Sequence, residues 1–137
     1  MPGKASHSCP TVLIVEDSEG SATTLEVAFS GIPGICVVMA RNAPDALQIL
    51  ERDKDVVCAL VTDLNMPRMD GFELIERVRG NGRHGKLPII VVSGDIDPET
   101  PHRIARLGAD AFFSKPYSPA QVRQKLEQLL NDYRRCA

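Results

Sequence analysis

The part of the sequence that decides the fold is Val56–Pro67, which reads VVCALVTDLNMP. Its first residues are apolar and rich in valine, which predicts a strand buried on both faces over Val56–Thr62. Asp63 follows with a carboxylate that would be costly to bury without a partner. Because open parallel sheets present their ligand-binding residues at the carboxyl ends of the strands, we expect Asp63 to lie at a crevice there.

The composition is that of one globular domain. The chain has 137 residues, of which 43% are hydrophobic and 25% charged, enough for a single core. Its net charge of −2 argues against direct binding of nucleic acid, which usually needs a basic face. No apolar run is long enough for membrane insertion, and residues 1–10 lack the apolar segment of a secretory signal. We expect a cytoplasmic protein with a polar tail at 1–10, a domain over 11–134 and a short tail at 135–137.

The four cysteines form no C-x-x-C pair. Cys36 and Cys58 lie in predicted strands, whereas Cys9 and Cys136 lie in the tails. We therefore expect two buried thiols and two tail thiols, all reduced, as is usual in the cytosol. The three histidines show no metal-ligand spacing.

Apolar runs alternate with segments of helical periodicity along the whole chain. The predicted strands are Thr11–Val15, Ile35–Ala40, Val56–Thr62, Leu87–Val92 and Ala111–Phe113; the predicted helices are Ser18–Ile32, Asn42–Leu50, Gly71–Arg79, Asp97–Leu107 and Ser118–Tyr133. Strict alternation with short connections predicts an α/β fold, a single doubly wound (βα)5 domain of flavodoxin-like type. Right-handed crossovers favour a five-stranded parallel sheet in the order 2-1-3-4-5.

Short signals mark the expected ends of the helices. Asn42, Asp70, Asp97 and Ser118 are predicted amino-terminal caps, and Gly108 suits the position just after a helix. The glycine-rich loop Gly80–Lys86 lacks the phosphate-binding pattern G-x-x-x-x-G-K-[ST]. It is interpreted as a solvated connection, in which Arg83, His84 and Lys86 are candidates for steering an acidic partner.

Five polar side chains follow the predicted strands. Because all strand ends of a parallel sheet point the same way, the fold would gather these groups at one rim: Glu16, Asp17, Asp63, Ser93 and Lys115. Crowded carboxylates repel one another unless a cation intervenes, and hard oxygen ligands suit Mg²⁺. We expect Asp17, Asp63 and the main-chain carbonyl of Asn65 to bind the ion directly, with Glu16 acting through water.

The remaining two groups at the rim favour phosphoryl chemistry. Lys115 brings a charge suited to a phosphoryl oxygen or to Asp63, and Ser93 offers a hydroxyl to another phosphoryl oxygen. A carboxylate, a metal ion, a lysine and a hydroxyl match what phosphoryl transfer needs. No dedicated general base for a hydroxyl substrate is evident, which favours attack of Asp63 on phosphorus to form an acyl phosphate.

From Thr11 to Tyr133 the chain closely resembles the receiver domain of two-component response regulators. The resemblance is carried by Glu16-Asp17, by Asp63-Leu64-Asn65-Met66-Pro67 with Asp70-Gly71, by Ser93-Gly94, and by Phe112 ahead of Lys115-Pro116. Each of these motifs alone is weak evidence for the family, but their combined order and spacing are highly specific. The resemblance implies a CheY-like fold.

The resemblance also implies roles for these residues. Asp63 accepts a phosphoryl group from a histidine kinase or a histidine phosphotransfer protein, with Mg²⁺ held by Glu16 and Asp17. Lys115 contacts the phosphoryl group, and its peptide bond to Pro116 is cis. Ser93 and Phe112 switch, and the surface of the fourth helix, fifth strand and fifth helix changes shape for a downstream protein. Slow self-catalysed hydrolysis resets the domain, which is therefore not an enzyme with separate substrate turnover.

Two positions depart from the commonest pattern of the family. Ser93 stands where threonine is frequent, so the hydroxyl remains with freer rotamers. Phe112 stands where tyrosine is frequent, so the ring has no hydroxyl to hydrogen-bond. Both departures bear on the strength of the switch rather than on phosphorylation.

Two other classes of function stay open. A phosphohydrolase of the haloacid dehalogenase type also uses an aspartyl phosphate, but its nucleophile follows the first strand and a second aspartate stands two residues on, where this chain has Asn65. A flavodoxin-like module that binds flavin mononucleotide would need a hydroxyl-rich loop after the first strand, where this chain has the acidic Glu16-Asp17.

We expect the protein to act in trans, as a stand-alone receiver or a piece of a larger regulator. A phosphorylation-dependent dimer is a further alternative.

Overall fold

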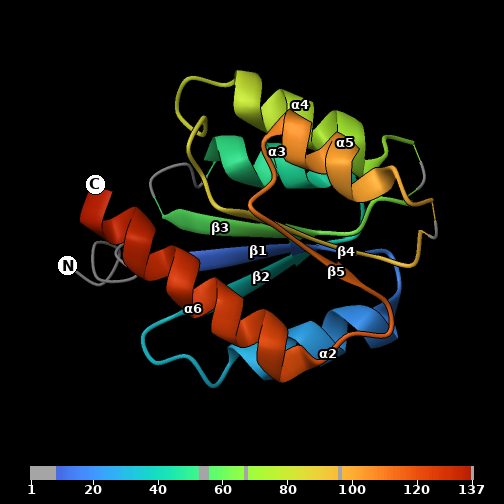
Figure 1. Cartoon of the computed structure of the whole chain (residues 1–137). Helices are drawn as coiled ribbons and strands as arrows, with labels where there is room; N and C mark the ends of the chain where they lie inside the picture. Colours follow the sequence, from blue (N-terminus) through green and yellow to red (C-terminus); the bar gives the residue numbers. More distant parts are fainter. Residues whose placement is uncertain (1–8, 53–55, 67, 96, 137) are drawn as a thin grey trace.

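The computed structural model describes residues 9–52, 56–66, 68–95 and 97–136. A five-stranded parallel sheet has the strand order β2-β1-β3-β4-β5 (Figure 1), which confirms the predicted topology. The strands are β1 (Thr11–Val15), β2 (Cys36–Ala40), β3 (Val57–Thr62), β4 (Ile89–Ser93) and β5 (Ala111–Ser114). The helices are α2 (Glu19–Phe29), α3 (Ala43–Arg52), α4 (Gly71–Gly80), α5 (Thr100–Leu107) and α6 (Pro119–Cys136).

Helices cover both faces of the sheet, with α3, α4 and α5 on one side and α2 and α6 on the other (Figure 1). Each face has its own apolar core. Leu60 and Val91 point toward the three-helix side, whereas Val61 and Ile90 point toward α2 and α6. This alternation along strands buried on both sides explains why β1, β3 and β4 are continuous apolar runs in the sequence.

Most predicted caps are confirmed. The backbone N–H of Asp45 donates to Asn42 Oδ1 at 2.8 Å, that of Glu73 to Asp70 Oδ1 at 3.0 Å, and that of Gln121 to Ser118 Oγ at 3.3 Å. Gly108 follows α5 with φ of 106°, the left-handed conformation that glycine adopts without a steric penalty.

The predicted cap at Asp97 is wrong. Asp97 closes a turn instead: its side chain accepts the backbone N–H of Glu99 at 2.9 Å, and its carbonyl oxygen accepts that of Thr100 at 3.1 Å. Helix α5 therefore begins later, at Thr100, whose side chain is buried. Helix α2 is also shorter than predicted, because it ends at Phe29 rather than Ile32.

The prediction of four reduced thiols is wrong for two of them. Cys9 and Cys36 form a disulfide with a Cα–Cα distance of 6.2 Å, and Cys36 is exposed rather than buried. Parallel pairing of β1 with β2 places Thr11 opposite Cys36, which brings the residue before β1 close to the start of β2. Spacing of cysteines along the chain could not reveal a pair that only the strand register creates.

The steering role predicted for the loop after α4 needs a correction at His84. Arg83 and Lys86 are exposed, but only 4% of His84 is accessible and its Nε2 lies 3.3 Å from the carbonyl oxygen of Leu50. His84 therefore helps to hold the loop against the end of α3 and cannot face a partner.

Arg79 fixes the connection between α5 and β5. Its Nη2 donates to the carbonyl oxygen of Gly108 at 2.7 Å and to Asp110 Oδ2 at 3.2 Å. Burial lowers the pKa of Arg79, and the charge of Asp110 opposes this effect. Asp110 in turn accepts the backbone N–H of Ile89 at 2.8 Å, so one half-buried guanidinium joins α4, the start of β4 and the end of α5.

In the described part of the chain, no helix has the length and apolar character needed to cross a bilayer.

Gly71 sits where α4 touches the turn after β3, and this contact leaves no room for a side chain. A Cβ on Gly71 would collide with the carbonyl oxygen of Asp63 and would lie 2.8 Å from Leu64 Cα. We predict that Gly71→Ala lowers the free energy of unfolding by about 1–3 kcal/mol, because backbone must shift to relieve the overlap. Urea denaturation monitored by circular dichroism measures the change.

Gly80→Ala is the matched control, because a Cβ at the other end of the same helix meets nothing within 4 Å. This substitution should be neutral or stabilise by up to about 1 kcal/mol through helix propensity. Equal losses of stability in the two variants would contradict the close approach at Gly71.

Candidate functional site

Three charged side chains meet at the carboxyl ends of the strands. Glu16 follows β1, Asp63 follows β3 and Lys115 follows β5. The Lys115 ammonium donates to Asp63 Oδ2 at 2.8 Å and to Glu16 Oε1 at 3.2 Å. The parallel strand order thus brings together groups that are 52 and 99 residues apart in the sequence.

Asp63 is held in place by the turn that it begins. Its Oδ1 accepts the backbone N–H groups of Leu64 at 2.6 Å and Asn65 at 3.3 Å, and its own N–H donates to the carbonyl oxygen of Val15 at 3.1 Å. About 8% of the side chain is exposed, so a small part of it reaches solvent. Oδ2 is bound to Lys115 but to no backbone group, which makes it the oxygen available for chemistry.

Glu16 is the most buried of the three charged side chains, with 1% of its side chain exposed. Burial raises the pKa of Glu16, and the nearby charge of Asp63 raises it further. The N–H of Ser18, which donates to Glu16 Oε2 at 3.2 Å, and the ammonium of Lys115 counteract part of this effect. The net rise therefore comes mainly from burial, with the neighbouring Asp63 charge as the second contribution.

The two carboxylates in turn shift the pKa of the Lys115 ammonium. Burial alone would lower the pKa of Lys115, but the hydrogen bond and charge of Asp63, together with Glu16, outweigh burial and raise it. The side chain is 27% exposed, so it can follow a group that arrives from solvent.

Asp17 and Ser93 reach the same rim without joining this ion pair. Asp17 is exposed. Ser93 is fully buried, its hydroxyl accepts the N–H of Asp95 at 3.1 Å, and its carbonyl oxygen accepts the N–H of Lys115 at 2.8 Å. Ser93 therefore positions the backbone of Lys115 and keeps its hydroxyl beside the loop that follows β4.

The other predicted residues lie around this centre. Asn65 is exposed. Phe112 is half-buried against the core under α3, α4 and α5, where it lines a small hollow of about 100 Å³ with Pro101 and Ile104. The peptide bond between Lys115 and Pro116 is cis, as the resemblance to the family predicts.

Sequence reasoning missed three contributors to the site. The N–H groups of Leu64 and Asn65 hold the Asp63 carboxylate, and no side-chain pattern reports such backbone donors. Tyr117 is half-buried beside Lys115, and burial raises the pKa of its phenol. With Lys115 and residues of α2, Tyr117 lines an open hollow of about 260 Å³ beside the ion pair, also bordered by Gly20, Ser21, Thr24 and Pro116.

The donor set fits Mg²⁺ in its chemistry. Glu16, Asp17 and Asp63 offer carboxylate oxygens, the hard ligands that Mg²⁺ prefers. Across residues 9–52, 56–66, 68–95 and 97–136, no three His, Cys, Asp or Glu side chains are arranged as a ready-made metal cluster. Two of the carboxylates are bound to Lys115 instead.

Comparison with known proteins identifies the class. A family model described as the response regulator receiver domain matches residues 12–127. The chain is 29% identical over 119 residues to a chemotaxis protein CheY homolog of Campylobacter jejuni, covering 87% of this chain and 91% of that protein.

Solved structures of response regulators are similar to this chain in fold. A response regulator receiver protein from Pseudomonas putida has a TM-score of 0.75 at 33% identity, covering 90% of this chain and 96% of the other. The chemotaxis response regulator CheY4 of Vibrio cholerae has a TM-score of 0.76 at 26% identity, and the match covers 88% of this chain and 98% of the other.

The chain belongs to the response regulator receiver domain family. It is a phosphoacceptor module of two-component signalling with a CheY-like fold, and not a metabolic enzyme of the ordinary kind. None of these findings supports a haloacid dehalogenase-type phosphohydrolase.

The raised pKa of Lys115 predicts a pH dependence of stability. A lysine whose pKa is raised on folding stabilises the fold at pH values below its unfolded pKa, and this stabilisation is lost as the pH rises through the folded value. Wild-type protein should therefore lose stability above about pH 10.4. Lys115→Met should show a smaller alkaline loss, because the raised pKa of Tyr117 still contributes, and it should be less stable at pH 7 by about 1–3 kcal/mol, because two buried carboxylates lose their counter-ion.

Urea denaturation at a series of pH values from neutral to alkaline measures both effects. Lys86→Met, which removes an exposed lysine, is the control and should retain the wild-type profile. An unchanged alkaline loss of stability in Lys115→Met would contradict the charge balance described above.

Proposed function

We propose that Asp63 is the phosphoacceptor of a phosphorelay and that its donor is the phosphohistidine of a histidine kinase or a histidine phosphotransfer protein. The observation that carries this proposal is the Asp63 carboxylate, which is fixed through Oδ1 by two backbone N–H groups, while Oδ2 is hydrogen-bonded to Lys115 alone among the described residues. An Asp63 oxygen attacks phosphorus, the P–N bond to the donor imidazole breaks, and the products are an acyl phosphate and a free histidine.

Lys115 and Ser93 act on the phosphoryl group after transfer. The Lys115 ammonium already lies 2.8 Å from Asp63 Oδ2, so it can pass to a phosphoryl oxygen with little movement. The Ser93 hydroxyl, at the end of the neighbouring strand, donates to a second phosphoryl oxygen. Both contacts neutralise charge that the transfer brings into the site.

Mg²⁺ is the proposed cofactor. Glu16, Asp17, Asp63 and the main-chain carbonyl of Asn65 would hold it, with Asp17 and Asp63 in direct contact and Glu16 acting through water. When bound, the ion offsets the negative charge of the carboxylates and of the phosphoryl oxygens.

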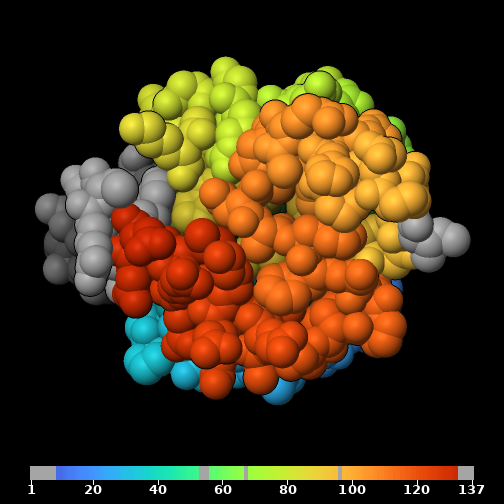
Figure 2. Space-filling view, viewed as in Figure 1, coloured from blue at the N-terminus to red at the C-terminus, as the bar shows by residue number. Residues whose placement is uncertain are grey.

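The proposed output is a change of the face made by α5, β5 and α6, which Figure 2 shows side by side on one surface. Ser93 moves toward the phosphoryl group, and the Phe112 ring turns into the space behind it. Phe112 borders the hollow beneath α5, so the movement of its ring alters the α5–β5 surface that a downstream protein contacts. A phosphorylation-dependent dimer through the same face is the alternative output.

Hydrolysis of the acyl phosphate by water resets the domain without a separate phosphatase site. The phosphoacceptor domain spans residues 11–134 in this proposal, with short tails at 1–10 and 135–137, and the protein works in the cytoplasm, where phosphohistidine donors would reach it.

Incubation with acetyl phosphate and Mg²⁺ tests the phosphoacceptor directly. Intact-mass measurement should find one added phosphoryl group, because small phosphodonors need only the site itself. The group should be absent in Asp63→Asn and when EDTA removes the metal ion.

Asp95→Asn is a control for the loss of an acidic group, because Asp95 lies beside the rim but carries no role in the transfer. It should be phosphorylated as the wild type is. Modification that persists in Asp63→Asn would place the acceptor elsewhere.

The Ser93 hydroxyl is tested by comparing alanine with threonine at this position. Ser93→Ala should slow phosphorylation by phosphoramidate about tenfold, the effect of losing one hydrogen bond to a charged group. Ser93→Thr keeps the hydroxyl and should stay within about threefold of the wild type. Time courses of intact mass measure the rates, and equal rates for alanine and threonine would show that the hydroxyl plays no part.

A further inference from the structure

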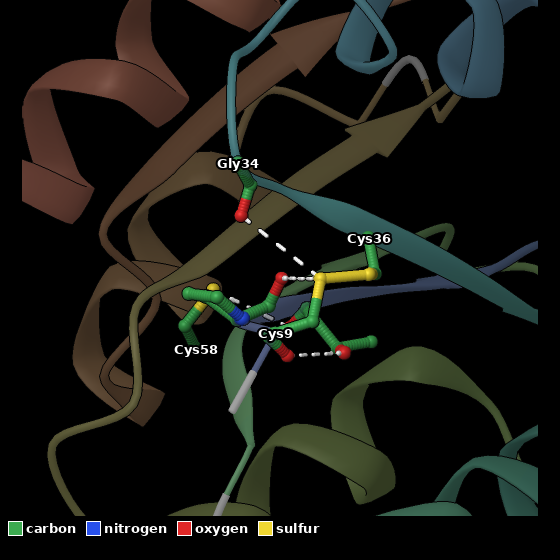
Figure 3. The surroundings of a disulfide bond; sticks show 6 residues. Cys9, Gly34, Cys36 and Cys58 are labelled. Atoms are coloured by element: carbon green, nitrogen blue, oxygen red, sulfur yellow. Dashed lines mark hydrogen bonds between the residues drawn. A yellow bond between two sulfur atoms is a disulfide. The ribbon is translucent and has the colours of Figure 1, made fainter. Parts of the chain in front are cut away.

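A disulfide lies at the end of the sheet opposite to the ion pair. Cys9 directly precedes Pro10 and β1, and Cys36 is the first residue of β2. The sulfurs therefore join the amino ends of β1 and β2 (Figure 3), whereas Glu16 and Asp63 follow the carboxyl ends of β1 and β3. Chemistry at the two ends of the sheet is thus separated by the length of a strand.

The bond ties the start of the domain to an edge strand. β2 pairs only with β1 in the sheet order, and the cross-link closes a loop of sequence separation 27 that contains β1 and α2. The backbone hydrogen bonds here do not depend on it: the N–H of Cys36 donates to the carbonyl oxygen of Pro10 and that of Thr11 to Val56, both at 2.8 Å. Cleavage of the bond would therefore remove a restraint and leave the strand pairing in place.

The surroundings suit both oxidation states of the pair. Cys9 Sγ lies 3.8 Å from the carbonyl oxygen of Pro10 and 4.0 Å from that of Gly34 (Figure 3). A disulfide sulfur has no hydrogen to donate, but once the two sulfurs separate on reduction, the Cys9 thiol would have a carbonyl oxygen on either side as an acceptor. Cys58 already uses its thiol in this way nearby, with Sγ 3.4 Å from the carbonyl oxygen of Thr11.

The two cysteine residues differ in access to solvent. Cys36 is exposed, whereas Cys9 is half-buried. Thiol–disulfide exchange requires a thiolate to reach a disulfide sulfur, so the more exposed residue, Cys36, is assigned as the site of attack and Cys9 as the leaving group.

We propose that Cys9 and Cys36 form a reversible dithiol–disulfide site whose reaction partner is a protein dithiol of the thioredoxin type. A thiolate of the partner attacks Cys36 Sγ, the Cys9–Cys36 bond breaks, and Cys9 leaves as a thiolate that takes up a proton. The second thiol of the partner then attacks the mixed disulfide and releases Cys36, so two electrons and two protons pass to the pair while the partner becomes a disulfide.

The regulatory meaning of this site depends on the cytoplasmic signalling function proposed above. In a reducing compartment, cysteine pairs that oxidise are usually redox-sensing rather than structural. Reduction releases the cross-link on the β1–α2–β2 unit and lowers the stability of the domain, while the Asp63 site keeps its chemistry.

The test uses the full chain, oxidised with glutathione disulfide and then reduced with thioredoxin, thioredoxin reductase and NADPH. Alkylation followed by peptide mapping should find Cys9 linked to Cys36 in the oxidised protein and both alkylated after native reduction. The melting temperature should fall by about 10 °C on reduction, as expected for a cross-link that closes a loop of this length.

Cys36→Ser should show no such shift, and Cys136→Ser, which removes a cysteine outside the pair, should keep the wild-type shift. A protein that never forms the Cys9–Cys36 link, that releases it only when denatured, or that carries only a glutathione adduct on Cys36 would overturn the proposal. A fall in melting temperature on reduction that persists in Cys36→Ser would also overturn the proposal.

Phosphorylation by acetyl phosphate should agree within about twofold between the oxidised and reduced proteins. A difference greater than tenfold would overturn the separation of the two sites. Absence of phosphorylation in both states, with the disulfide behaving as described, would instead count against the function proposed for Asp63 and not against the disulfide chemistry.

Discussion

The charge balance between Glu16, Asp63 and Lys115 is the constraint on which the rest of the structure depends. Two buried carboxylates share one ammonium, so the site is short of positive charge before any ligand arrives. A parallel sheet is what makes such crowding attainable, because it delivers separate strand ends to one edge. The backbone N–H groups after Asp63 then relieve part of the repulsion without adding a competing side chain.

Much of this arrangement was predictable, because it follows from periodicity and strand order. Apolar runs separated by helical segments fixed five strands and their topology, and every residue directly after a strand was then a candidate for the rim. Lys115, Asp63 and Glu16 were found in this way. The backbone donors at Leu64 and Asn65 were not, because any residue could supply an N–H there, and Tyr117 carried no signal of its own.

The wrong predictions share a different physical origin. Cys9 and Cys36 were assigned as separate thiols because their spacing along the chain says nothing about strand register. Asp97 has the right residue type for a cap, yet a local turn with Glu99 satisfies it three residues before α5 begins. His84 lies in a loop of polar composition, but tertiary packing against the end of α3 buries it. For the cysteines and His84, a contact across the fold overrode a local preference, whereas at Asp97 one local preference replaced another.

The anchoring of Gly108 by Arg79 has a mechanical consequence for α5. The guanidinium clasps the carbonyl oxygen at the carboxyl end of this helix and is itself braced by Asp110, which also holds the first residue of β4. The carboxyl end of α5 is therefore fixed to the sheet. If α5 tilted in response to movement of Ser93 and Phe112, its amino end would be displaced most. Thr100 and Pro101 would move furthest, and Leu107 would move least.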